Sequence, residues 1–293
     1  MVNMVKKAIS NTVLKEKTAQ AVFTLAACCC ILAVGLICVF LLISGIPALA
    51  EIGVLEFLFG TRWQPSSGEF GIGYMILGSL YVTAGALTLG VPLGLLTALY
   101  LSRFASTRLG QFLQRGVELL AGIPSVVFGF FGLVVIVPLI RQVLGGTGLS
   151  ILAASIILGV MVLPTIITVS RTALDAVPQS YYEGALALGA RHERCVFKIV
   201  LPAAASGITA AVILGFGRAI GETMAVVMIV GNQVRFPASI TDGIRTLTGN
   251  IVLEMGYAAD LHREALIATA LVLFVFILMI NLVFNLMKRR AGI

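Results

Sequence analysis

The chain has 293 residues, of which 59% are hydrophobic and 11% charged, and its mean hydropathy is +1.07. A typical soluble domain is about 25% charged, so this composition excludes a soluble globular enzyme, a disordered chain and a disulfide-stapled scaffold. The net charge of +7 does not by itself indicate nucleic-acid binding, because in a membrane protein the location of the positive charges matters more than their sum.

Six long runs with few or no charged residues predict membrane-spanning helices, because each run can cross about 30 Å of hydrocarbon at 1.5 Å per residue. The runs are continuous and lack polar alternation, which excludes a closed β-barrel. We therefore expect an all-α polytopic membrane protein with one transmembrane domain, residues 18–287, between a cytoplasmic segment, 1–17, and a basic tail, 288–293. The runs are 18–50, 70–102, 119–140, 142–170, 203–234 and 265–287.

The basic residues predict that both chain termini lie in the cytoplasm. Of the 20 Lys and Arg residues, five fall in one set of alternate loops and Arg218 falls inside a span, so the set that includes both termini holds the great majority. Basic residues concentrate on the cytoplasmic side of membrane proteins. The tripeptide at 48–50 resembles a signal-peptide cleavage site, but the apolar stretch before it is about 25 residues against 7–15 in a signal peptide. We therefore expect an uncleaved first span.

Several functional classes find no support in the sequence. The chain has no P-loop, so we expect it not to hydrolyse ATP itself, and we assign no catalytic residue. Its two histidines, His192 and His262, lie far apart, which argues against a metal centre. We expect His192 to be solvated and Trp63 to lie near a membrane interface. The cysteines in the first span are expected to be small apolar residues, with palmitoylation as the alternative: Cys28, Cys29, Cys30 and Cys38.

The segment 171–202 is too long and too patterned for a simple loop. Its middle part is rich in Ala and Leu and predicts a short helix, with Pro178 just ahead of it and Gly189 placed to end it. A basic strip, 191–198, follows. The pattern is typical of a docking element held against a membrane face, and the alternative is a basic loop that touches anionic lipid headgroups.

The same segment resembles the signature of ABC importer permeases. Gly184 replaces the usual first Ala of the signature, which loosens the helix by up to about 1 kcal/mol. The resemblance implies the type I ABC importer permease fold and identifies 171–202 as a coupling loop, whose helix sits in a groove of an ATPase subunit. The positions that match the signature are Glu183, Ala185, Gly189, Ile199, Leu201 and Pro202.

Further segments, 118–129, 217–226, 231–232 and 246–248, resemble phosphate-specific ABC permeases of the PstC type, and the likeness extends from about residue 55 to 281. The resemblance implies import of inorganic phosphate across the bacterial cytoplasmic (inner) membrane. It implies as partners a PstA-like second permease subunit, two copies of a PstB-like ATPase and an external PstS-like phosphate-binding protein, with membrane lipid around the chain and no nucleic acid. ATP and magnesium would be bound by the ATPase, and this chain would bind no cofactor.

Arg218 and Glu222 are two charges inside an otherwise uncharged run, and a charge at a helix centre is costly. Their i, i+4 spacing places both on one face of a continuous helix. We considered a structural ion pair, a polar lining of the substrate path and a proton relay. The path is favoured, because Arg can bind a phosphate oxygen with donors that Glu222 leaves free, while the carboxylate keeps binding weak enough for release. The resemblance agrees, and we place Thr223 beside them.

Two further features lie near this predicted path. Pro124 and Ser125 mark a break followed by a helix start, which is either an anion-binding helix N-terminus or a simple kink. Gly217 and Gly221 have a small-xxx-small spacing, which indicates packing against a second helix that lines the path or ordinary packing within the chain.

Two rival functions stay open from the sequence. One is a permease of the same class for another oxyanion, sulfate or molybdate, because the coupling loop fits both equally. The other is a proton-coupled secondary transporter that uses Arg218 and Glu222. That rival predicts inverted repeats and leaves the signature at 183–202 without a purpose.

Overall fold

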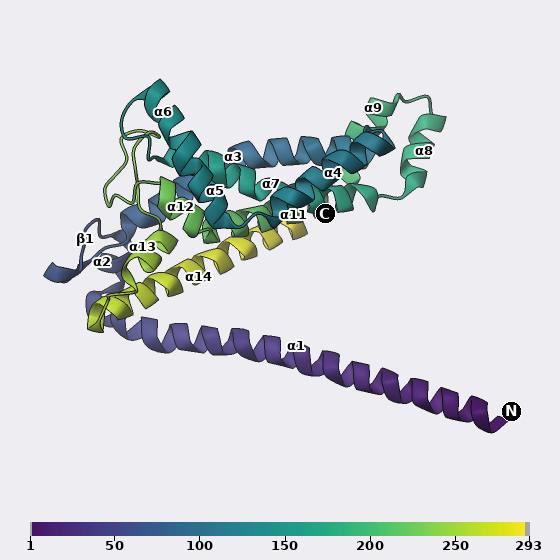
Figure 1. Ribbon diagram of the computed structural model, residues 1–293, viewed down its shortest axis with the longest axis horizontal. Helices are drawn as coiled ribbons and strands as arrows, with labels where there is room; N and C mark the ends of the chain where they lie inside the picture. The colour runs from purple at the N-terminus through teal and green to yellow at the C-terminus, as the bar shows by residue number, and fades with distance from the viewer. Residues whose placement is uncertain (1, 291–293) are drawn as a thin grey trace.

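The computed structural model describes residues 2–290 and is almost entirely helical, which confirms the predicted all-α class (Figure 1). A two-stranded antiparallel hairpin pairs Trp63 with Phe70. The α-helices and strands are α1 (Val2–Ile52), α2 (Val54–Phe59), β1 (Trp63–Gln64), β2 (Glu69–Phe70), α3 (Gly73–Arg103), α4 (Thr107–Gly122), α5 (Ser125–Phe131), α6 (Val137–Leu144), α7 (Ile151–Asp175), α8 (Gln179–Ala187), α9 (His192–Cys195), α10 (Leu201–Ala203), α11 (Ala205–Gly221), α12 (Met224–Ile229), α13 (Leu247–Glu254) and α14 (Asp260–Arg290). A 3₁₀-helix, η1 (Pro65–Ser67), and two π-helices, η2 (Gly132–Ile136) and η3 (Val196–Val200), lie between them.

Five helical segments are long and apolar enough to cross a membrane, and a sixth forms if the pair α9–α10 and α11 is taken as one span bent by 68°. The first, second and sixth predicted runs coincide closely with α1, α3 and α14. The segment α1 also includes the residues from Val2 onward that were expected to precede the membrane.

Three predicted runs differ from the helices. The third run starts too early, because α4 ends at Gly122 and the spanning segment begins only at Ser125. The fourth run also starts too early, because residues 145–150 form a loop in which three glycines have positive φ. There α7 begins after Ser150, whose hydroxyl accepts a hydrogen bond from the amide of Ala153, as an N-cap does. The fifth run is broken after Gly221.

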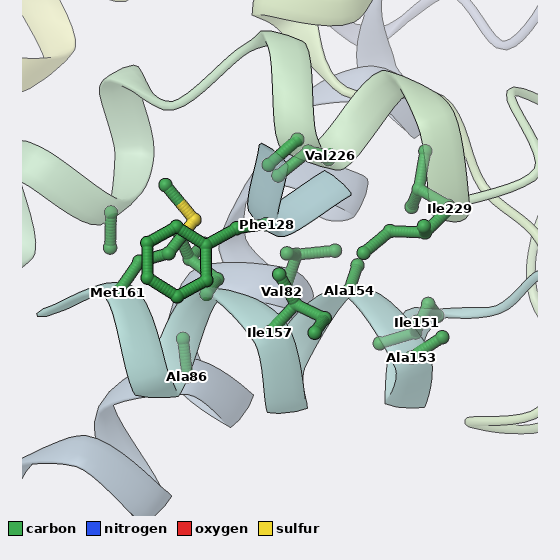
Figure 2. Close-up of a cluster of buried hydrophobic side chains, with 14 of the residues drawn as sticks. Val82, Ala86, Phe128, Ile151, Ala153, Ala154, Ile157, Met161, Val226 and Ile229 are labelled. Carbon is green, nitrogen blue, oxygen red and sulfur yellow. The ribbon is translucent and has the colours of Figure 1, made fainter. Parts of the chain in front are cut away.

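The centre of the molecule is α7, which packs against both α3 and α11. Small residues allow the close approach of α3 and α7: a Cβ added at Gly90 would lie 2.7 Å from Val162 Cγ2 and 3.1 Å from the carbonyl oxygen of Gly159. An apolar cluster joins α7 to α5 and α12. In this cluster the Phe128 ring points toward Met161, and Val226 faces the same core (Figure 2). The helices that follow the chain breaks are therefore anchored on α7.

Helix α1 stands apart from this body (Figure 1). It contacts α14 only near its own C-terminal part, where Gly45 lies against Ala268 and Leu271. None of the most apolar 18-residue window of α1 is buried by the chain itself. The side chains of this stretch, which include the free and exposed Cys28, Cys29 and Cys30, therefore face the surroundings of the molecule.

The body has two distinct ends (Figure 1). At one end, called here the α13 end, lie α2, the β1–β2 hairpin, α6 and α13. At the other, the α8 end, lie α8, α9 and the first turns of α4. Helix α3 connects the two over 31 residues, or about 46 Å at 1.5 Å per residue.

We expect Gly90→Leu to lower the thermal unfolding midpoint of the permease in detergent, because the added side chain meets the backbone of α7. Overpacking of this kind costs about 1–3 kcal/mol. The matched control is Gly116→Leu, since nothing lies within 4 Å of a Cβ at Gly116 on α4. Equal midpoints for the two variants would contradict the close α3–α7 packing.

Candidate functional site

The site is built on a break between α11 and α12. Helix α11 ends at Gly221, and Glu222 has extended backbone angles, φ −68° and ψ 130°. Helix α12 then begins at Met224. The prediction that Arg218 and Glu222 project from one continuous helix is therefore wrong, and the described residues contain no ion pair between them. The i, i+4 spacing fails because the helix does not continue through Glu222.

Glu222 is fixed in place by α12 and α13. Its Oε1 atom accepts a hydrogen bond of 3.3 Å from the amide of Ala225 in the first turn of α12. Its backbone oxygen accepts one of 3.2 Å from the Thr248 hydroxyl of α13. The Thr223 hydroxyl donates to the carbonyl oxygen of Gly221. Both the backbone and the side chain of Glu222 are thus occupied in joining three segments.

Arg218, by contrast, is exposed in the last turn of α11. Across the described residues, no hydrogen bond or ion pair involves its guanidinium group. On the same stretch of α11, nothing lies within 4 Å of a Cβ added at Gly217 or Gly221. A cation in the last turn is favoured by the helix dipole, and its donors are free to meet a ligand or another chain. This face of α11 is uncovered.

Buried hydroxyl groups surround the break on the side of α3 and α13. The Ser79 hydroxyl accepts a hydrogen bond of 2.9 Å from the amide of Leu247. The Thr246 hydroxyl accepts one of 3.1 Å from the amide of Gly249 and caps α13. With Glu222 they line a small cavity. The sequence singled out Thr246 and Thr248 only as part of a resemblance, and Ser79 gave no signal because it lies in an apolar span.

A second break lies between α4 and α5. Ile123 and Pro124 have extended backbone angles, and α5 begins at Ser125, so the chain breaks where Pro124 and Ser125 were expected to interrupt it. Helix α5 packs directly on α12: a Cβ at Gly129 would lie 2.8 Å from the Cα of Ala225. The two segments that follow the breaks therefore lie side by side.

At the α13 end, one carboxylate gathers donors from three other parts of the chain. Glu254 Oε2 accepts hydrogen bonds from Trp63 Nε1 at 2.8 Å and from His262 Nε2 at 2.9 Å, and its Oε1 accepts one from Arg245 Nη1 at 2.6 Å. We call these four residues the Glu254 cluster. Glu254 itself lies outside the candidate spans, whereas His262 lies near the start of the last one, Asp260–Phe284. Burial raises the pKa of Glu254, but the hydrogen bonds from Trp63, His262 and Arg245 and the charge of Arg245 outweigh it, and the net pKa lies below the ordinary value.

The Glu254 cluster gives Trp63 a partner inside the protein. Trp63 is 9% exposed, and its indole N–H is hydrogen-bonded to the Glu254 carboxylate instead of to water. His262 lies in the first turn of α14. The sequence could not reveal the cluster, because Trp63 and Glu254 are 191 positions apart.

At the α8 end, the helix expected in the coupling loop is present as α8. Gly189 has φ +81°, and the amides of Gly189 and Ala190 donate to the carbonyl oxygens of Leu186 and Ala185, at 2.9 and 3.1 Å. This is the Schellman arrangement, in which a left-handed glycine ends a helix. Leu188, just before it, is 91% exposed. Glu183 and Gly184 are also exposed. Ile199 lies in the π-helical segment Val196–Val200, and Leu201 and Pro202 begin α10.

The coupling loop is fixed to the end of α3 rather than free. Tyr182 Oη and His192 Nδ1 form a hydrogen bond of 2.8 Å. The His192 ring also packs edge-on against Phe104, with 4.8 Å between ring centroids. The expectation of a solvated His192 is thus wrong: its ring is partly buried and links α8 and α9 to the residue that follows α3.

The fold and the broken spans define a multi-pass membrane permease. Residues 90–292 match the family of binding-protein-dependent transport system inner membrane components, and the chain belongs to this family. Its members are membrane subunits of ABC importers and are not themselves enzymes. The chain is therefore an integral membrane protein.

Among the relatives that this chain resembles are two ABC transporter permeases, one of them named for phosphate transport. The chain is 39% identical over 282 residues to the "Probable ABC transporter permease protein YqgH" of Bacillus subtilis (strain 168), covering 92% of this chain and 91% of the relative. It is 32% identical over 277 residues to the "Phosphate transport system permease protein PstC" of Haemophilus influenzae, covering 85% and 88%.

Solved structures support the fold. A chain of the MetNI methionine ABC transporter, solved in inward-facing conformations, matches with a TM-score of 0.55 and 22% identity, over 75% of this chain and 94% of that one. The match confirms the predicted type I ABC importer permease fold.

The lowered pKa of Glu254 predicts an acid-sensitive α13 end. The folded chain keeps this carboxylate ionised where the unfolded chain protonates it, so ionisation contributes stability above the ordinary Glu pKa of about 4.3. That contribution disappears as the pH falls through the lower folded-state pKa. We expect Glu254→Gln to reduce the thermal midpoint in detergent near neutral pH and the deficit to shrink in acid. A deficit that is equal at all pH values would contradict this assignment.

Proposed function

We propose that this chain is one half of the membrane channel of an ATP-driven importer of inorganic phosphate in the bacterial cytoplasmic membrane. The observation that carries the proposal is Arg218: an exposed guanidinium without a protein partner among the described residues, in the last turn of the bent candidate span and just before a helix break. A cation within a membrane needs a counter-charge, and a passing anion would supply one. The relatives named as phosphate permeases support the choice of anion.

The chemistry of the break fits transient anion binding. The planar guanidinium of Arg218 can donate two parallel hydrogen bonds to phosphate oxygens. Glu222 stays close in the chain but is held by the amide of Ala225, so it does not block Arg218. Its negative charge keeps the affinity of the site for the anion low. Transport requires this, because the ion must leave as readily as it enters. Thr223 lies between the two helices of the break.

The uncovered face of α11 indicates that the path is completed by a second subunit. One arginine gives few contacts to a multivalent anion, and the open positions at Gly217 and Gly221 permit the close approach of another helix. We propose that a PstA-like permease packs here and contributes the opposite wall of the path.

The α8 end is proposed to face the cytoplasm and to receive the driving force. The basic residues favour this orientation, with both termini inside. The exposed Leu188, Glu183 and Gly184 of the coupling loop would dock into a PstB-like ATPase, two copies of which would bind ATP and magnesium. An external PstS-like protein would deliver phosphate at the α13 end.

Uptake of radiolabelled phosphate by membrane vesicles that contain the whole transporter tests the site. We expect Arg218→Gln to abolish uptake per folded permease without lowering the thermal midpoint, because Arg218 has no structural partner among the described residues. Arg218→Lys should also be impaired, since a point charge lacks the planar fork. Glu222→Gln keeps an oxygen that can accept the amide of Ala225, so any change in phosphate uptake by this variant reports the loss of the negative charge of Glu222. The matched control is Arg141→Gln, at another exposed arginine on a spanning segment.

Normal phosphate uptake by Arg218→Gln, or by the double variant Arg218→Gln with Glu222→Gln, would remove these residues from the path. Uptake of sulfate or molybdate in place of phosphate by the wild type would keep the permease class and reject the substrate. Uptake that needs a proton gradient and no ATP would reject the class.

The coupling role has its own test. Gly189→Ala places a Cβ in the left-handed region, at a cost of about 1–2 kcal/mol, and should tilt the end of α8 that carries Leu188. We expect the uptake per folded permease to fall several-fold while insertion is unchanged. The same change at Gly184, which is helical with open space around it, restores the Ala that is usual at this position of the signature and should not lower uptake. Equal uptake by the two variants would indicate that the loop serves only as a lipid-facing strip.

A further inference from the structure

The short helix α12, which begins directly after the break, is held near its start by a residue of α13 and near its end by Asn232, in the segment between α12 and α13. At its start, the Thr248 hydroxyl of α13 donates to the backbone oxygen of Glu222. Near its end, Asn232 Nδ2 donates to the carbonyl oxygen of Val227 at 2.7 Å. Asn232 has φ +51°, an unusual backbone conformation for a non-glycine residue. The position of α12 is therefore specified by residues outside it.

A continuous chain of hydrogen bonds connects Asn232, and through it the end of α12, to the Glu254 cluster. Arg245 Nε donates to the backbone oxygen of Asn232 at 3.2 Å, and its Nη1 donates to Asn250 Oδ1 at 3.0 Å and to Glu254 Oε1 at 2.6 Å. The route from Glu254 to the end of α12 thus passes only through Arg245 and Asn232. The same α13 helix carries Glu254 at its last position and Thr248 in its first turn.

Glu254 also reaches outward from α13. Trp63 belongs to the β1–β2 hairpin and His262 to the start of α14, and both donate to Glu254 Oε2. The Trp63 ring packs edge-on against Phe70 of the hairpin and against His262. One carboxylate therefore joins the outer hairpin, α14, α13 and the strap from residue 231 to 246.

We propose that Glu254 is a positioning residue for the translocation site: it links the outer hairpin and α14 to α12, and through α12 it sets where Glu222 lies relative to Arg218. Docking of a partner on the hairpin would shift α12 through this link. The functional meaning rests on the proposed function, whereas the mechanical link from Glu254 to α12 does not.

A carboxylate is required because all three incoming groups are donors. Two oxygens can accept the N–H groups of Trp63, His262 and Arg245 together. Gln has the same shape but only one acceptor oxygen, and its NH₂ group would oppose one of these donors. Glu254→Gln therefore breaks the junction with little change in volume. Trp63→Phe removes a single N–H and keeps an aromatic ring.

Hydrogen–deuterium exchange tests the mechanical link in the complete transporter in detergent, without phosphate or ATP. We expect Glu254→Gln to raise exchange in segments 224–234 and 246–254 and to leave α7 unchanged. The matched control is Glu69→Gln, which removes a carboxylate from the same hairpin whose partner is the exposed Arg62, 3.6 Å away. Exchange that rises in α7 as much as in α12, or that stays unchanged in α12, would overturn the proposal.

Phosphate uptake then tests the functional consequence. We expect Glu254→Gln to lower uptake per folded transporter about tenfold, within the range seen for residues that couple distant sites, and Trp63→Phe to lower it less. Glu69→Gln should transport as the wild type does. Normal uptake by Glu254→Gln despite raised exchange in α12 would overturn the positioning role. A wild type that imports no phosphate would instead reject the proposed function, and the exchange result would still decide the link.

Discussion

In a membrane interior, every backbone N–H and C=O group must find a partner inside the protein, because lipid offers none. An unbroken helix meets this requirement alone, and a broken one does not. The break between α11 and α12 is possible because side chains take over the freed groups: Glu222 accepts the amide of Ala225, and Thr248 donates to the oxygen of Glu222. The polar residues around the break thus make the interruption tolerable, and the interruption in turn leaves Arg218 at the end of a helix.

The long apolar elements could be predicted from the sequence, because a span of hydrocarbon thickness demands a run of apolar residues that nothing else in the chain explains. The breaks could not be located in the same way. The segment from α11 to α12 stays apolar on both sides of Glu222, so hydropathy carries no sign that the helix ends at Gly221. The start of α7 was misplaced for a related reason, since the glycines before it are apolar in composition but adopt positive φ.

Some residues of the candidate site could be predicted from the sequence, and others could not. Arg218, Glu222 and the glycine that ends α8 were identifiable because charges in a span and a left-handed helix end each carry a cost that needs a reason. The hydroxyls of Ser79 and Thr248 and the Glu254 cluster were not, since a single Ser or Thr in a span and a single Glu outside the spans are both common. Their significance comes only from contacts such as that between Trp63 and Glu254, which the chain brings together from its two halves.

The length of α1 has a consequence for how the molecule sits in its bilayer. Its apolar part, Glu16–Ile52, has 37 residues and measures about 55 Å, whereas the hydrocarbon core is about 30 Å thick. A helix with this excess must tilt steeply, protrude or do both. Because α1 is attached to α14 only near its C-terminal part, its tilt can adjust without disturbing the packing around α7. The permease can accordingly accommodate membranes of different thickness through one peripheral helix while the core around the break keeps its dimensions.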